Sequence, residues 1–215
     1  NDADFSAQNI RIENGFYVFD VKTPTEVVQN VKFGLPGHHN LTNALLAFAM
    51  AKSYGVSNEK IIAALASFQG VRRRFSFQIR EEKLVYIDDY AHHPTEINAV
   101  HQAVRELYPG KKIIAAFQPH LFSRTKDFVD GFAESLSKFD EILLLEIYPA
   151  RELPMEGVNS TWLLNKIDNI NKKLVSKDEL FTAFENSDAD VFITIGAGDI
   201  GELVKDLKKA LHEKN

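Results

Sequence analysis

The side chains best suited to chemistry stand together near the middle of the sequence, in residues 88–96. This segment supplies two carboxylates, a phenol and two imidazoles: Asp88, Asp89, Tyr90, His92 and His93. Side chains of these types can hold a polar small molecule or transfer protons. The segment is therefore predicted to be an active-site loop.

The residues on either side of this segment predict the elements that hold it. Residues 84–87 are apolar and rich in β-branched and aromatic types, as in a buried strand. From residue 96 to residue 107, apolar side chains recur at spacings of three and four, which is typical of a helix with one apolar face. Pro94 suits the start of that helix, and Thr95 can cap it. Because ligands of open α/β sheets bind beyond the carboxyl ends of the strands, the position of the segment agrees with its chemistry.

The imidazoles of this segment, together with His120, could also suggest a metal site. Adjacent residues such as His92 and His93 seldom ligate one ion, and no two histidines of the sequence stand four residues apart. The sequence therefore favours polar contacts to a small substrate over metal binding. Ordinary hydrogen-bonded loop histidines are the alternative.

Two basic stretches and one glycine-rich turn are open to more than one interpretation. Arg124 follows a predicted strand, and its planar guanidinium suits a carboxylate or a phosphate, although a surface arginine would look the same. Residues 72–74 are all arginine, a pattern typical of a solvated charged run. Residues 196–201 are glycine-rich but follow the last predicted strand, which favours a tight turn over a dinucleotide site. The sequence contains no Walker phosphate loop.

The composition of the 215-residue chain is that of an ordinary globular protein, with 45% apolar and 26% charged residues. A formal net charge of -5 argues against nucleic-acid binding, which depends on clustered cations. The absence of cysteine excludes disulfides and thiolate metal sites and fits a reducing compartment. There is no apolar run of about 18 residues and no charged-then-apolar leader, so we expect a cytoplasmic protein without a membrane span.

The order of the predicted elements indicates an α/β fold with a boundary near residue 70. Residues 1–33 predict a small β-meander, with an Asn-Gly hairpin signal at residues 14–15. A loop over residues 34–40 and helices near residues 41–54 and 57–68 follow. From residue 71, strands and helices alternate, which predicts a mostly parallel sheet covered on both faces. The predicted strands span residues 84–87, 112–117, 141–147, 173–175 and 190–195. The predicted helices span residues 96–108, 126–139, 161–169, 178–185 and 200–211.

Several short motifs, taken in order, resemble those of one protein family. They are Gly37-x-His39-Asn40-x-x-Asn43-Ala44, Arg73-Arg74-Phe75, the whole segment 88–96, Phe117-Gln118-Pro119-His120 with Ser123-Arg124-Thr125, Tyr148-Pro149-Ala150-Arg151-Glu152, and Gly196-Ala197-Gly198. On these residues the sequence is similar to the Mur ligases of peptidoglycan synthesis. The match extends from about residue 10 to residue 201, and it is closest to the members that join L-alanine to UDP-N-acetylmuramate.

This resemblance implies a place within a three-domain enzyme. Mur ligases have an N-terminal domain for the UDP-sugar, a central ATPase domain and a C-terminal Rossmann-like domain. By resemblance, residues 1–70 are the last part of the central domain and residues 71–215 are the C-terminal domain, so the chain is a fragment that we expect to be inactive alone. The ATP phosphate loop, the Mg²⁺ ligands and the UDP-sugar site are expected in the remainder of the same enzyme.

The resemblance also implies the reaction and the nucleotide contacts. Mur ligases use ATP to convert a sugar-linked carboxylate into an acyl phosphate, which the amino group of the incoming amino acid attacks. The implied substrates are L-alanine, ATP and UDP-N-acetylmuramate. Asn40 and Asn43 would lie by the adenine, and Arg74 and Asp89 would reach the ribose and phosphates.

The amino-acid pocket is implied by three further motif residues. Tyr90, His92 and Arg124 would form the L-alanine pocket, with Arg124 pairing the carboxylate. Asp89, His92 and Arg124 are the residues expected to act in catalysis. Some family members carry a basic residue where this sequence has Leu121, so the sequence departs from the family at the position of a second cation.

Three other functions remain open. A recycling ligase of the same family, which adds a preformed tripeptide to the same sugar, shares the motif of residues 88–94 but usually departs from the motif of residues 117–125. A non-catalytic nucleotide or amino-acid binding module would be favoured if no ATPase sequence preceded these residues in the gene. A dinucleotide oxidoreductase would have to bind a nicotinamide cofactor through residues 196–201.

Overall fold

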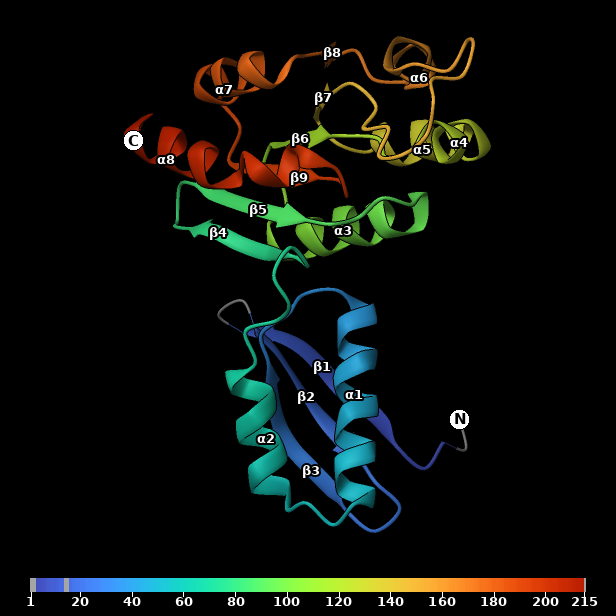
Figure 1. Ribbon diagram of the computed structural model, residues 1–215. Coiled ribbons are helices and arrows are strands. Elements are labelled where there is room, and N and C mark those ends of the chain that lie inside the picture. Colours follow the sequence, from blue (N-terminus) through green and yellow to red (C-terminus); the bar gives the residue numbers. More distant parts are fainter. Residues whose placement is uncertain (1–2, 14–15, 215) are drawn as a thin grey trace. The chain divides into compact units, whose positions relative to one another are not determined.

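The computed structural model describes residues 3–13 and 16–214, and the chain divides into two compact units (Figure 1). One unit comprises Asn1–Gly70 with Gln102–Pro109, and the other comprises Val71–His101 with Gly110–Asn215. Each unit has a hydrophobic core of its own. The hairpin signal at residues 14–15 lies outside the described residues.

The first unit is the predicted β-meander with two helices. Its strands are β1 (Ser6–Glu13), β2 (Phe16–Lys22) and β3 (Val27–Phe33), which form an antiparallel sheet in that order, and its helices are α1 (His38–Ser53) and α2 (Asn58–Ser67). Phe19, Val31 and Phe48 are fully buried and join strands to helices in one core. The predicted end of the loop at residue 40 is wrong. Gly37 turns the chain with a φ of 95°, and α1 begins at the next residue.

The second unit contains a mostly parallel sheet of six strands in the order β4-β5-β9-β6-β7-β8. The strands are β4 (Ser76–Arg80), β5 (Val85–Asp89), β6 (Ile113–Phe117), β7 (Glu141–Leu144), β8 (Lys172–Leu174) and β9 (Val191–Ile195). Only β4 runs antiparallel to its neighbour, and the other pairings are parallel. The predicted α/β class and parallel sheet are confirmed, whereas β4 was not predicted.

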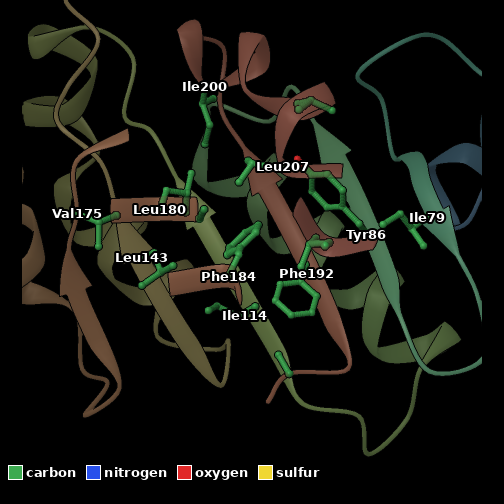
Figure 2. Packing of buried hydrophobic residues seen from close by; sticks show 14 of the residues in the cluster. Ile79, Tyr86, Ile114, Leu143, Val175, Leu180, Phe184, Phe192, Ile200 and Leu207 are labelled. Carbon is green, nitrogen blue, oxygen red and sulfur yellow. The ribbon is translucent and has the colours of Figure 1, made fainter. Parts of the chain in front are cut away.

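Helices cover both faces of this sheet, as the alternation of elements predicted. They are α3 (Pro94–Leu107), α4 (Phe122–Asp127), α5 (Val129–Leu136), α6 (Ser160–Lys166), α7 (Lys177–Asn186), the 3-10 helix η1 (Asp199–Glu202) and α8 (Val204–Lys214). On one face, Phe184 of α7, Leu207 of α8 and Ile114 of β6 belong to one buried core (Figure 2). On the other face, the ring of Phe117 lies 5.5 Å from that of Phe132 in α5. None of the described helices has the length and apolar character needed to cross a membrane.

Several predicted boundaries are wrong, and two of these errors bear on the site. The first carboxylates of segment 88–96 belong to a strand, because β5 continues through Asp89 and Asp88 pairs with Thr194 in the ladder. The helix predicted over residues 126–139 is two helices, because Phe128, with φ -116° and ψ 20°, interrupts it and α4 already begins at Phe122. The strand predicted over residues 141–147 ends at Leu144.

The core of the second unit predicts a large loss of stability when one of its rings is removed. Phe184 is fully buried between Tyr86 and Phe192, with ring centroids 6.3 and 5.1 Å away. Phe184→Ala should lower the free energy of unfolding by about 3–5 kcal/mol, because the packed sheet cannot close the cavity. Urea unfolding measures the change. Ile170→Ala, at a side chain that is 97% exposed, is the control and should change stability by less than about 0.5 kcal/mol; equal losses for both variants would contradict the assigned core.

Candidate active site

Three parallel strands of the second unit end at the same level, and this brings the sequence motifs together. Asp89 of β5 pairs with Ile195 of β9, which in turn pairs with Phe117 of β6. Beyond these residues, the Gly196 amide donates to the Asp89 carbonyl at 3.1 Å, and the Gln118 amide donates to the Ile195 carbonyl at 3.0 Å. The loops that follow β5, β6 and β9 therefore begin side by side at one edge of the sheet.

Asp88 is a buried carboxylate with protein partners on both oxygens. Its side chain is 1% exposed; Arg73 Nε donates to Oδ2 at 3.1 Å, and the Thr194 hydroxyl donates to Oδ1 at 2.8 Å. Burial raises the pKa of Asp88, while the Arg73 and Thr194 contacts oppose the shift. The interpretation of residues 72–74 as a solvated run is thus wrong for Arg73, although Arg72 and Arg74 are exposed.

Asp89 fixes the chain on both sides of β5. Oδ2 accepts a hydrogen bond from the Phe75 amide and Oδ1 accepts one from the Ala91 amide, both at 2.7 Å. Burial raises the pKa of Asp89 to about 6, and these two amide donors limit the rise. The carboxylate thereby joins the segment before β4 to the loop after β5.

Tyr90 and His92 lie at the surface end of this loop. The Tyr90 side chain is 38% exposed, and its ring packs edge-on against that of His92 with centroids 5.4 Å apart. His92 Nδ1 lies 2.9 Å from the Tyr90 carbonyl, and since a carbonyl only accepts, Nδ1 carries the proton. In the neutral ring, Nε2 is then left as a hydrogen-bond acceptor.

His120 and Arg124 occupy the loop and helix start after β6. Leu121, with a φ of 74°, turns the chain into α4, and the Leu121 amide donates to the Tyr148 carbonyl at 2.9 Å. Arg124 Nη1 lies 3.4 Å from His120 Nδ1, which must accept because a guanidinium only donates. Burial and the Arg124 cation lower the pKa of His120, so this ring stays neutral at pH 7.

The same geometry brings the two loops into contact. The ring centroids of His92 and His120 are 6.4 Å apart, and the His120 ring stacks on Tyr148 at 5.7 Å. From the sequence, His120 was weighed with His92 and His93 as a metal ligand, a loop histidine or a contact to a small substrate, and it was not assigned to the amino-acid pocket. Its position four residues before Arg124 was the signal in the sequence that could have placed the two side chains together.

Arg124 has a free charge toward this cluster. Its neighbour Ser123 takes the nearby carboxylate, since the Ser123 amide donates to Glu152 Oε2 at 2.9 Å and its hydroxyl donates to Oε1. These bonds hold the pKa of Glu152 below its ordinary value. Within residues 3–13 and 16–214, Arg124 forms no ion pair. The guanidinium is therefore available to an anionic ligand.

The glycine turn after β9 is filled by protein side chains. Gln118 is 4% exposed; its Nε2 donates to Asp199 Oδ1 at 2.8 Å and its Oε1 accepts from the Ile200 amide at 2.9 Å. A Cβ atom on Gly198 would lie 2.3 Å from Gln118 Oε1 and 2.7 Å from Tyr148 Cβ. Glycine is thus required for close packing in this turn, in agreement with the tight-turn interpretation.

The residues predicted to contact the nucleotide are divided between the units. Asn40 lies in the first turn of α1, where its side chain donates to the Pro36 carbonyl at 2.7 Å, and Asn43 is exposed one turn further on. Arg74 is exposed in the second unit, beside Arg72 and Tyr90 in a shallow hollow. Their predicted roles therefore stay predictions.

No group of three or more histidine and carboxylate side chains in the described part of the chain could hold a metal ion.

Known proteins match this chain in sequence and in fold. Residues 73–198 match the family described as Mur ligase, glutamate ligase domain. The chain belongs to the Mur ligase family. It is 71% identical over 214 residues to UDP-N-acetylmuramate–L-alanine ligase of Flavobacterium psychrophilum, covering 100% of this chain and 48% of that protein. The protein with the same name from Flavobacterium johnsoniae is 65% identical over 212 residues, covering 99% of this chain and 47% of that protein.

A solved Mur ligase has the same fold. UDP-N-acetylmuramate-alanine ligase of Thermotoga maritima superposes with a TM-score of 0.78 at 26% identity, covering 98% of this chain and 45% of that chain. The chain thus spans about half the length of the curated relatives that it matches.

The buried Asp89 carboxyl predicts a dependence of stability on pH. Its folded-state pKa, about 6, lies above the ordinary value of 3.8, so between these values the folded protein binds the proton more tightly than the unfolded chain. Stability from this group is present below pH 3.8 and is lost as the pH rises through about 6. Asp89→Asn cannot ionise, so the wild type should lose stability relative to this variant, by up to about 3 kcal/mol, on going from about pH 4 to pH 7. Urea unfolding across this range tests it, and a parallel pH dependence in both proteins would refute the shift.

Proposed function

We propose that this chain is the C-terminal part of an ATP-dependent ligase that joins L-alanine to UDP-N-acetylmuramate in peptidoglycan synthesis. The names of its relatives, and the order in which the motifs that resemble the family follow one another in this sequence, support this function. In the proposal, residues 1–70 complete the central ATPase domain and residues 71–215 bind the amino acid. Because the nucleotide substrates are cytoplasmic, we expect the enzyme to act in the cytoplasm.

The observation that carries the proposal is the Arg124 cation, which forms no ion pair within the described residues and lies beside the His120 ring, itself next to His92. An amino acid presents a carboxylate and an ammonium group about one carbon apart. Arg124 can bind the carboxylate through two parallel N–H donors, as its planar fork favours. His92, 6.4 Å from His120 between ring centroids, offers an acceptor for the ammonium group.

The chemistry that these residues perform is positioning and proton transfer. The ammonium group of L-alanine must lose a proton before its nitrogen lone pair can attack the activated carbonyl. In the proposal, His92 accepts that proton at Nε2, since Nδ1 already donates to the Tyr90 carbonyl. Attack then forms the amide bond and releases phosphate from the acyl phosphate. Arg124 and Tyr90 hold the amino acid in line, and Glu96, 3.4 Å from His92 Nδ1, stabilises the imidazolium that forms.

The nucleotide contacts are proposed from the motifs. Asn40 and Asn43 would contact the adenine, and Arg74 the ribose and phosphates. Asp89 would join Arg74 in that role, although both of its oxygens already accept backbone hydrogen bonds and leave one acceptor position each. Mg²⁺ ligands are expected in the remainder of the same enzyme.

Replacing Arg124 tests the amino-acid site in the complete enzyme. Arg124→Ala should raise the KM for L-alanine about 10- to 100-fold, because it removes a charge-assisted contact to the carboxylate, while the KM for ATP changes less than about twofold. Steady-state ADP release measures both constants.

Lys126→Ala provides the control, because Lys126 is an exposed cation on the same short helix. It should leave the KM for L-alanine unchanged. An Arg124→Ala enzyme with the wild-type KM for L-alanine would show that Arg124 does not bind the amino acid.

A further inference from the structure

The Arg73 guanidinium makes three separate contacts where β5 and β9 end. Nε donates to the buried Asp88 carboxylate at 3.1 Å, and Nη2 donates to the Gly196 carbonyl at 2.7 Å. The guanidinium carbon also lies 5.1 Å from the centre of the Tyr90 ring, within the range of a cation–π contact. The orientation of the guanidinium is thus fixed by two partners, Asp88 and Gly196, which are 15 and 123 residues away in sequence.

The backbone of Arg73 reaches Tyr90 as well. Arg73 adopts a φ of 62°, which a non-glycine residue keeps only when its surroundings hold it, and its carbonyl accepts from the Tyr90 amide at 2.7 Å. A Cβ atom on Gly201 would lie 2.3 Å from the guanidinium carbon, so the chain also leaves room for this head group on its far side. Arg73 therefore contacts Tyr90 twice, through the Tyr90 amide and through the Tyr90 ring.

These contacts continue to the imidazole of the amino-acid site. The Tyr90 carbonyl is the acceptor for His92 Nδ1 at 2.9 Å, and the two rings touch edge-on. A displaced Tyr90 would free the His92 ring to change its tautomer, and the acceptor at Nε2 would be lost. A plain structural ion pair between Arg73 and Asp88 would require neither the ring contact nor the amide contact.

We propose that Arg73 is a positioning residue that orients Tyr90 and, through the Tyr90 carbonyl, sets the tautomer of His92 for the incoming amino acid. This inference rests on the proposed function for the identity of the amino acid. In this proposal Arg73 acts on the amino acid through Tyr90 and His92 and makes no contact with it. Its effect is to keep the phenol and the imidazole in one arrangement before the amino acid arrives.

Arg73→Lys in the complete enzyme is the first test. Lysine keeps the charge that Asp88 needs, but its single ammonium cannot also reach Gly196 and cover the Tyr90 ring. The KM for L-alanine should rise about tenfold and kcat should fall, because His92 both contacts the amino acid and takes its proton, while the KM for ATP stays within about threefold of wild type. Arg72→Lys, at the exposed neighbouring arginine, is the matched control and should leave all three constants unchanged. A wild-type KM for L-alanine in Arg73→Lys would overturn the proposal.

A coupling experiment separates positioning from a purely structural role. If Arg73 acts through Tyr90, adding Arg73→Lys to Tyr90→Leu should change the KM for L-alanine less than about twofold further. Independent, multiplying effects would overturn the proposal. The double variant Arg73→Met with Asp88→Asn removes both buried charges and should fold. If Arg73 positions Tyr90, this variant keeps the raised KM for L-alanine. If Arg73 serves only as the ion-pair partner of Asp88, its KM for L-alanine returns to the wild-type value.

The tautomer of His92 gives a readout that does not need activity. In ¹⁵N NMR spectra of the complete enzyme, His92 should show the Nδ1–H tautomer in wild type and a mixture in Arg73→Lys. An identical tautomer in both proteins would overturn the proposal. If the wild type shows no L-alanine-dependent ADP release, the proposed function fails, and the ¹⁵N spectra still decide the role of Arg73.

Discussion

The parallel pairing of β5, β9 and β6 is the constraint on which the site depends. Parallel strands share a direction, so their carboxyl ends gather at one edge of the sheet. The register that aligns Asp89, Ile195 and Phe117 starts three loops at the same level, although they are separated by up to about 100 residues. Close packing then fixes the loops against each other: a Cβ atom on Gly196, whose φ is 145°, would lie 2.7 Å from the Gln118 carbonyl oxygen.

The polar groups of the site are of two kinds: those whose hydrogen bonds are all made within the protein, and those that are exposed or without an ion-pair partner in the described residues. Asp88, Asp89 and Gln118 are bonded to protein partners, and no buried side-chain nitrogen or oxygen in the described residues lacks a hydrogen bond. These groups hold the loops in place, because leaving any of them unpaired in the interior would be costly. Arg124 and Tyr90, in contrast, present a cation and an exposed phenol. In the proposed function, binding is therefore assigned to the groups that these internal contacts leave available.

The sequence predicted the α/β fold because its strong patterns are local. The apolar runs of β6 and β9 and the alternation with helices need no knowledge of distant residues. β4 was missed because it is a partly buried antiparallel edge strand, whose order depends on pairing with β5. The role of Arg73 was missed because its partner Gly196 is 123 residues away, and a triplet of arginines looks solvated when read locally. The roles of Asn40, Asn43 and Arg74 rest on motif resemblance alone, since their side chains show no geometry that requires a nucleotide.

The central claim is that Arg124 binds the carboxylate of the incoming amino acid. The most direct measurement compares L-alanine with L-alaninamide, which lacks that carboxylate, as substrates of the complete enzyme. The wild type should prefer L-alanine in kcat/KM by about 100-fold, and Arg124→Ala should lower this preference to near unity because only the contact to the carboxylate has been removed. An Arg124→Ala enzyme that keeps the full preference for L-alanine would show that Arg124 does not bind the carboxylate.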